Sequence, residues 1–211
     1  MSQAIEQQTA EAVMRARHSV KKYQTGVTIP EAELNEILEL ANTAPSSWNL
    51  QHWRFLVITD QANKEKVLPI AYGQKQVVES SATIIVLGDT EADKVAPSVY
   101  DPAVQGGFIT QEVRDTLVGQ IQGAYQNVPT IGRDEAIRNA SFAAMQLMLA
   151  AKAKGYDTCP MGGFDAIALT KELNIPSRYI PVLMITLGKA AAPAHPSGRF
   201  PLSQVVIKER F

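Results

Sequence analysis

The chain has 211 residues, 45% of them hydrophobic and 19% charged, which is enough apolar content for one sizeable core. Twenty basic against 21 acidic residues give a net charge of -1, so no overall field favours nucleic acid, a membrane surface or a polyanion. The single cysteine, Cys159, excludes an intramolecular disulfide and fits a reducing compartment. Because the polar N-terminal stretch lacks the apolar core of a signal peptide, we expect a cytoplasmic protein.

The first third of the chain predicts two helices followed by a strand. A polar helix leads into "RARHSVKKY", and a second helix within 28–42 begins with a possible capping box from Thr28 to Glu31. That second helix must end before Pro45, because proline disfavours helical backbone in the preceding residue. The stretch "APSSWNLQHWRF" is therefore a helix-to-strand loop that holds both tryptophans, and "RFLVIT" is the strand after it.

The rest of the chain alternates apolar runs with helical patterns. "ATIIVLGD" and "YIPVLMITLG" are typical of strands covered on both faces. Between them, residues 107–127 predict an amphipathic helix with Phe108 and Tyr125 on one face. Residues 133–154 predict a central buried helix, apolar on nearly every side from 140 to 151, with Gly155 as its C-terminal cap. The tail from about 189 is too rich in alanine, proline and glycine for another helix until its end.

Several common chemistries lack their motifs. The three histidines are scattered, without paired spacing to each other or to Cys159, so we expect no structural metal. The chain has no Gly-x-Ser-x-Gly, Walker or Gly-x-Gly-x-x-Gly sequence. What remains is a set of anion-binding groups and glycine-containing loops, which suits a large bound cofactor better than a catalytic set of side chains.

Four segments, in order and spacing, resemble the nitroreductase family of flavin enzymes: "RARHSVKKY", "APSSWNLQHWRF", "AMQLMLAAKAKGYDTCPMGGFD" and "GRFPL". The resemblance implies an α+β fold with a central sheet flanked by helices, in one domain over 1–211. It also implies an intertwined homodimer with FMN at the interface and a tail, about 189–211, that embraces the partner. The β-branched residues of "SQVVIKERF" suit the addition of a strand to a sheet.

The resemblance places the FMN phosphate, ribityl chain and one ring edge beside Arg17, His18, Ser19 and Lys21. Arg199 matches a second phosphate anchor. A guanidinium can hold a phosphate through two parallel charge-assisted hydrogen bonds, and lysine adds a point charge. The alternative is that the basic residues near the first helix only complement its C-terminus and stay solvated.

In the resemblance, the loop before the first strand reaches the flavin bound mainly by the other subunit, through Pro45, Ser46, Ser47 and Asn49. Hydroxyl and amide groups can satisfy the polar ribityl chain and ring edge. We expect Trp48 and Trp53 to fix the loop by packing rather than by stacking on the cofactor. Many relatives have proline where this chain has His52, which we interpret as an interface residue with a satisfied ring rather than a catalytic acid.

"CPMGGFD" supplies the other wall, since Pro160, Met161, Gly162 and Gly163 resemble the loop whose amides approach the flavin N5. Many relatives have glutamate where this chain has Gly162. Gln76 matches a contact to the pyrimidine edge, the alternative being an exposed helix face. Cys159 is expected to be a small packed residue, and Asp165 to cap the following helix.

The implied function is an FMN-dependent oxidoreductase: NAD(P)H reduces the flavin at N5, and a nitroaromatic, quinone or similar acceptor then takes the electrons. No side chain is assigned as acid or base. Residues 108–127 are expected to form a variable cover, with Phe108 and Tyr125 available for aromatic contact or simply packed. The alternatives are another flavin reaction on this scaffold, such as dehalogenation or oxidation, and a flavin-binding protein without turnover. Neither NADH nor NADPH is favoured.

Overall fold

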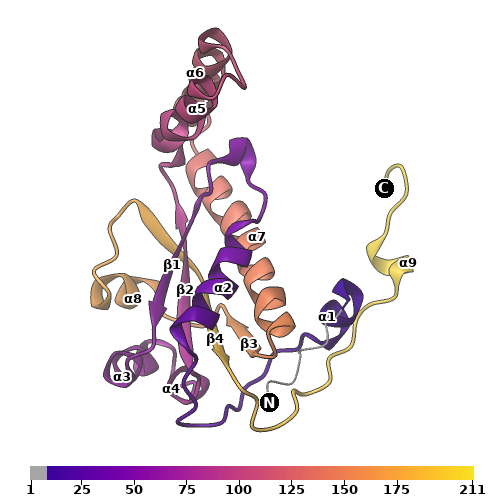
Figure 1. Ribbon diagram of the computed structural model, residues 1–211. Helices are drawn as coiled ribbons and strands as arrows, with labels where there is room; N and C mark the ends of the chain where they lie inside the picture. Colours follow the sequence, from indigo (N-terminus) through magenta and orange to yellow (C-terminus); the bar gives the residue numbers. More distant parts are fainter. Residues whose placement is uncertain (1–8) are drawn as a thin grey trace.

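The centre of the molecule is a four-stranded antiparallel sheet. The computed structural model describes residues 9–211, and it orders the strands β1-β2-β4-β3 (Figure 1). Their bounds are Trp53–Ile58 for β1, Ala82–Asp89 for β2, Asp157–Met161 for β3 and Tyr179–Gly188 for β4. β1, β2 and β4 confirm the three predicted strands, with β1 shifted by one residue.

Strand β3 was not predicted as a strand. It is only five residues long, and it contains Pro160, which has no backbone N–H to give to a ladder. Proline is tolerated here because β3 is the last strand of the sheet, at the edge beyond β4.

Helices cover both faces of the sheet. Neighbouring residues of β2 point to opposite faces, and both sets are apolar, so each face needs a covering layer. Ile84 and Val86 pack with α2 (Glu31–Asn42) and the long helix α7 (Ile131–Ala153). Ile85 and Leu87 face a second core formed with three shorter helices: α3 (Gln61–Ile70), α4 (Gln76–Glu79) and α8 (Ala166–Glu172). All eight residues of β2 are therefore buried.

Two of the expected helix ends can be compared with the structure. Gly155, at a φ of +75°, follows the end of α7 as predicted, in a conformation that glycine adopts without strain. The predicted capping box is wrong: α2 begins after Pro30, and no side chain caps its first turn.

A helical hairpin projects from one end of the sheet (Figure 1). The 3-10 turn η2 (Ala92–Val95) leads into α5 (Ala96–Gln105), and α6 (Gln111–Asn127) returns. Phe108 does not belong to the predicted amphipathic helix: it lies in the turn between α5 and α6, where Gly107 has a φ of +72°, and Thr110 caps α6. The base of the hairpin packs on Leu50, at the loop before β1.

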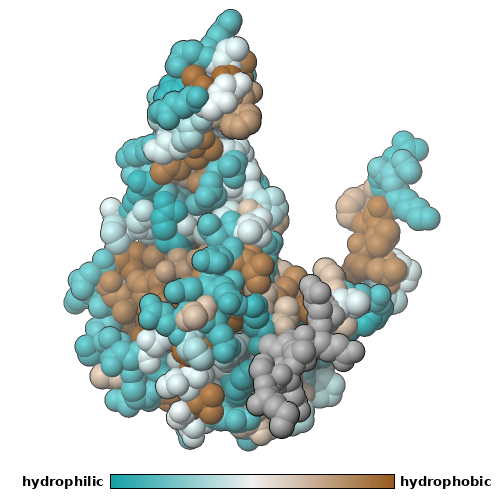
Figure 2. Space-filling view, viewed as in Figure 1, coloured by the Kyte–Doolittle hydropathy of each residue, from teal (hydrophilic) through white to brown (hydrophobic). Residues whose placement is uncertain are grey.

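The ends of the chain leave the opposite end of the sheet. Helix α1 (Ala10–Ala16) precedes a segment that is tied to the start of the tail, where Ala191 N–H donates to Lys22 O at 2.9 Å. The tail then runs away from the body, and its apolar side chains near α9 (Leu202–Val205) are uncovered (Figures 1 and 2). Within the single chain, the expected extra strand from 203–211 does not form.

One face of α7 also lies open. The helix is buried along the sheet as predicted, yet Phe142 and Met145 are 47% and 42% exposed. Leu40 of α2 and Met14 of α1 are exposed as well, and α1, α2 and α7 line one shallow groove. In residues 9–211, no helix is both long enough and apolar enough to cross a membrane.

Close contact between α7 and β2 generates a stability prediction. A Cβ added at Gly88 would stand 2.8 Å from Ala136 O, so Gly88→Ala must push the helix off the sheet. We expect a loss of about 1–3 kcal/mol in the free energy of unfolding, measured by urea titration.

The matched control is Gly119→Ala, in an exposed part of α6 with nothing within 4 Å of the added Cβ. This change should stabilise the protein by up to about 1 kcal/mol, the usual gain from replacing glycine in a helix. Equal effects of the two variants would contradict the close-packing interpretation.

Candidate functional site

One half of the predicted site forms along the outer edge of β3. Ser19 pairs with Thr158 of β3 in a parallel bridge, and Val20 N–H donates to Thr158 O at 3.0 Å. The segment from Arg17 to Lys21 thus runs beside β3 towards the Gly162–Gly163 loop. The structure brings together the predicted groups of these two segments: Arg17, His18, Ser19, Lys21, Pro160, Met161, Gly162 and Gly163.

Polar groups in this half lack protein partners. Within residues 9–211, neither Arg17 nor Lys21 forms an ion pair. In the same range, the N–H groups of Gly162 and Gly163 donate to no protein acceptor, and nothing stands within 4 Å of the Cβ position of Gly162. Two cations, two free donors and an open backbone fit a ligand with both an anionic group and a hydrogen-bonding ring.

Gln76 joins this half from the buried side. It is only 7% exposed, and its Nε2 donates to Gln74 Oε1 at 3.2 Å and approaches Met161 Sδ at 3.6 Å. The alternative of an exposed helix face is therefore wrong. Sequence reasoning missed Gln74, whose Nε2 donates to Gly163 O at 2.8 Å and holds the glycine loop. Its only sequence signal was its place in the same short segment as Gln76.

The other predicted half lies at the opposite edge of the sheet. Pro45, Ser46, Ser47 and Asn49 precede β1, which is separated from β3 by β2 and β4. The two halves are also offset along the strands, because Trp53 pairs with Gly88 whereas Met161 pairs with Met184, opposite Ile85. One chain therefore does not bring its own two halves together.

The loop before β1 has an unusual backbone. Trp48, Asn49 and Gln51 have φ angles of 51°, 56° and 48°, the left-handed region. Asparagine tolerates this conformation, but tryptophan and glutamine do so at a cost of about 1–2 kcal/mol each. Surrounding contacts must therefore impose the loop's shape.

Helix α7 supplies the main polar contacts of the loop. Ser47 N–H donates to Asn139 Oδ1 at 2.8 Å, and Ser47 Oγ donates to Glu135 Oε2 at 2.6 Å. Asn139 Nδ2 also donates to Glu135 Oε2 at 2.8 Å, and Arg138 pairs with the same carboxylate from outside. Burial opposes ionisation of Glu135, but the hydrogen bonds and the Arg138 charge outweigh it and lower its pKa.

Both tryptophans pack, as predicted. Trp53 is 3% exposed in the α2–α7 core, and its Nε1 donates to Asn42 Oδ1 at 2.9 Å. Trp48 packs against the hairpin base, where Tyr100 Oη donates to its carbonyl at 3.0 Å. The packing of these two large side chains therefore holds the loop in place.

The remaining predicted contacts are spread out. Arg199 is exposed in the tail, and within residues 9–211 it donates only to Ser197 and Gly198. Phe108 is 84% exposed at the hairpin turn, whereas Tyr125 is partly buried at its base. Two smaller predictions are confirmed: Cys159 is a packed residue whose thiol pKa is raised by burial, and Asp165 caps α8.

A sequence profile described as "Nitroreductase family" matches residues 14–189. The chain belongs to the nitroreductase family. This membership confirms the resemblance drawn from the four segments, and with it the expected class of oxidoreductase.

Relatives of known name match over most of this nitroreductase. "Putative NAD(P)H nitroreductase YodC" of Bacillus subtilis (strain 168) is 53% identical, covering 92% of this chain and 95% of YodC. The "CLA biosynthesis enone reductase" of Lactiplantibacillus plantarum is 37% identical, covering 85% and 84% of the two chains. The crystal structure of a "putative nitroreductase in complex with FMN" from Exiguobacterium sibiricum 255-15 has a TM-score of 0.89 at 40% identity, covering 96% and 98%. The predicted fold class is confirmed.

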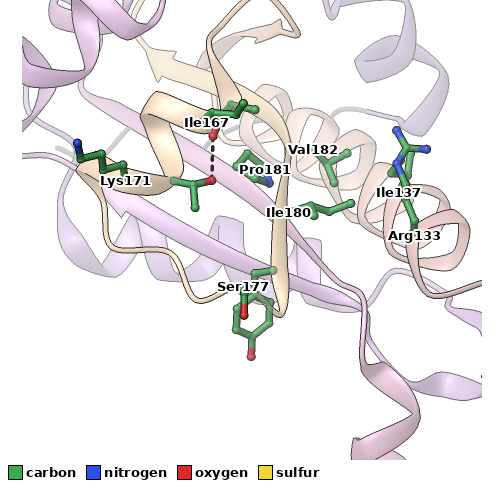
Figure 3. A pocket seen from close by; sticks show the side chains of 11 residues that line it. Arg133, Ile137, Ile167, Lys171, Ser177, Ile180, Pro181 and Val182 are labelled. Atoms are coloured by element: carbon green, nitrogen blue, oxygen red, sulfur yellow. Dashed lines mark hydrogen bonds between the residues drawn. The ribbon is translucent and has the colours of Figure 1, made fainter.

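One cavity of this nitroreductase lies outside the predicted site. It measures about 750 Å³ and lies between the start of β4, α8 and the N-terminal end of α7 (Figure 3). Ile180 and Val182 line it, with Arg133 and Lys171 on opposite sides. None of the predicted cofactor-binding residues lines this cavity.

His52 ties the hairpin to the start of β1. It is fully buried, its Nε2 lies 3.1 Å from Tyr125 Oη, and its Nδ1 has no partner within the described chain. The expected satisfied ring is thus only half right. Burial lowers the pKa of His52 against the smaller opposing effects of Glu135 and Asp89, so the neutral ring is favoured.

This buried neutral histidine predicts a pH dependence of stability. Below about pH 6.5 the unfolded chain binds a proton at His52 that the folded chain resists, so stability falls as the pH falls. Between pH 7.5 and 5.5, the wild type should lose about 1 kcal/mol more than His52→Gln, which keeps a partner for Tyr125 but does not titrate. Urea titrations at the two pH values measure the difference, and parallel losses would contradict it.

Proposed function

We propose that this nitroreductase is an FMN-dependent NAD(P)H oxidoreductase that reduces nitroaromatics, quinones or related conjugated acceptors. The observation that carries the proposal is the β3 edge. There Arg17 and Lys21, which form no ion pair within residues 9–211, lie on the same edge as the N–H groups of Gly162 and Gly163, which have no acceptor in that range. The FMN complex of the Exiguobacterium relative supports the choice of flavin.

The residues of this edge fit FMN in a definite arrangement. Arg17 and Lys21 would bind the phosphate side, and Arg199 of a tail would add a second guanidinium. Gln76 would face the pyrimidine edge with the amide that the buried end of α4 presents. The free N–H groups of Gly162 and Gly163 would donate to the ring near N5, where negative charge develops on reduction.

Bound FMN would supply the redox chemistry, accepting hydride equivalents from NAD(P)H and passing them to the second substrate. The protein would orient the two substrates in turn and exclude water from the ring. Cys159 offers no nucleophile, because it is buried and its thiol pKa is raised. A buried thiol as the sole cysteine also supports a reducing, cytoplasmic setting.

We further propose that the working unit is a homodimer with shared sites. The two predicted halves of the site occupy opposite edges of one sheet. The exposed face of α7, with Phe142 and Met145, is an apolar surface on which a partner subunit would pack. A two-fold axis at this face would place the loop of one subunit, with Ser47 and Asn49, at the β3 edge of the other. The α5–α6 hairpin, packed on that loop, would then cover the partner's ring.

The tail would complete the assembly. Its apolar residues project from the body with nothing to cover them, as Phe200 and Leu202 show at 74% and 75% exposure. Strand β1 is an edge strand, and two cavities flank it on either side of Val57. The β-branched end of a partner's tail would add to this edge, with which no strand of residues 9–211 pairs.

The proposed cofactor and reaction are tested together by purification and anaerobic half-reactions. We expect yellow protein that releases FMN on denaturation, is reduced by NADH or NADPH, and is re-oxidised by a nitroarene or a quinone. Rapid rates in both steps support the reductase. Flavin binding without reduction by either nicotinamide would favour a flavin-binding protein, and reduction without re-oxidation by these acceptors would favour another flavin reaction. Recovery of FAD, or no flavin after reconstitution, would refute the cofactor.

The shared site predicts complementation between two inactive variants. Arg17→Ala/Lys21→Ala damages the β3 half, and Ser47→Ala/Asn49→Ala damages the loop half. A mixed dimer then has one site with both lesions and one site with neither, so about half of the wild-type turnover per dimer should return. Differently tagged chains, co-expressed and purified as the heterodimer, allow this measurement. Persistently low activity in a folded heterodimer would place the loop in its own subunit's site.

A further inference from the structure

Ser47 has its only hydroxyl proton committed within its own chain. The Ser47 Oγ to Glu135 Oε2 separation is 2.6 Å, and the acceptor is a carboxylate held in its charged form by its neighbours. A hydroxyl has one proton to donate and two lone pairs that accept. With the proton directed at Glu135, the side of Ser47 that faces a ligand can only accept a hydrogen bond.

The groups that direct Ser47 are themselves rigid. Glu135 and Asn139 lie one helical turn apart on α7, and they are 8% and 0% exposed. Asn139 Nδ2 donates to both Oε2 and the backbone carbonyl of Glu135, at 2.8 and 2.7 Å. Its Oδ1 takes the Ser47 N–H, so each polar atom of the Asn139 amide has a defined partner. Neither residue was singled out by sequence reasoning.

We propose that Glu135 and Asn139 are positioning residues that fix Ser47 as a hydrogen-bond acceptor toward the flavin bound by the partner subunit. The proposal rests on the proposed function, because it requires the loop to meet a partner's FMN. The proposal requires that the flavin group in contact with Ser47 donates a hydrogen bond, so it must be a ribityl hydroxyl or the ring N3–H. Neither Glu135 nor Asn139 touches the flavin.

The first test measures FMN affinity by flavin fluorescence in Glu135→Gln, Ser47→Ala and the double variant. Glutamine at 135 must turn its N–H₂ group either toward Ser47 and Asn139 or toward Arg138, and a donor already points at the carboxylate from each side. The carboxylate that fixes the geometry of Ser47 is therefore lost in either orientation. We expect each single variant to weaken FMN binding by about three- to tenfold, the scale of one hydrogen bond between neutral groups. The double variant should bind FMN no more weakly than either single variant.

The matched control is Glu36→Gln, which removes an exposed carboxylate that pairs with Lys154 on the helical surface. It should leave FMN affinity unchanged. Unchanged affinity in Glu135→Gln, or losses that add in the double variant, would overturn the proposal. Asn139→Asp, which puts a carboxylate against Glu135 and removes its Nδ2 donor, tests the same point if Glu135→Gln fails to fold.

A second test separates positioning in trans from simple destabilisation. In a heterodimer, a Glu135→Gln chain paired with an Arg17→Ala/Lys21→Ala chain should regain one tight FMN site. The same chain paired with Ser47→Ala/Asn49→Ala should regain none. If Glu135→Gln merely damages its own chain, neither heterodimer regains a tight site, and the proposal fails. Failure of the wild type to bind FMN would instead refute the proposed function.

Binding of riboflavin and of lumiflavin, which lacks the ribityl chain, shows whether Ser47 accepts from a ribityl hydroxyl or from N3–H. If Ser47 accepts from a ribityl hydroxyl, Ser47→Ala and Glu135→Gln should weaken riboflavin but leave lumiflavin unaffected. If it accepts from N3–H, both flavins should lose affinity equally. Loss of neither would contradict the acceptor role.

Discussion

The contact of helix α7 with the sheet is the constraint on which the rest of the structure depends. The helix lies so close to β2 that Gly88 has no room for a side chain against Ala136. One face of α7 therefore completes the main core, and its first three turns hold the loop before β1 through Glu135 and Asn139. The remaining face, with Phe142 and Met145, is not covered by any part of residues 9–211. The core, the geometry of the loop and this exposed apolar face are thus properties of one helix.

Sequence patterns predicted the elements whose signal is local. Continuous apolar runs gave β1, β2 and β4, and the long apolar stretch gave α7 with Gly155 at its end. Strand β3 gave no such signal, because it is short, contains Pro160 and owes its place to β4 and to the segment at Ser19. The capping box predicted at Thr28 does not form, because α2 begins after Pro30 and no side chain caps its first turn. The strand expected near the C-terminus does not form, because residues 203–211 lie far from the open edge of β1 in their own chain.

The site divides in the same way. The family resemblance predicted Arg17, Lys21, Gly162 and Gly163 as cofactor contacts, and the structure brings these residues to one edge of the sheet. Gln74, Glu135 and Asn139 could not have been found from the sequence, because their roles come from single hydrogen bonds across long chain separations. A buried glutamate on an otherwise apolar helix looks like a surface residue until the loop that covers it is in place. His52 likewise could be placed at an interface, but its bond to Tyr125 and its unpaired Nδ1 depend on the hairpin.

The apolar tail and the open edge of β1 have a consequence for folding before the two subunits of the proposed dimer associate. A newly made subunit carries an open strand edge together with a β-branched segment able to add to such an edge. Such elements allow newly made chains to form open-ended aggregates, in which each tail would dock on the β1 edge of the next molecule instead of two chains forming a closed dimer. For the proposed dimer, folding in a crowded cell would therefore be a competition between closure of the pair and polymerisation. Synthesis of two chains near each other, or a chaperone that shields the edge, would favour closure.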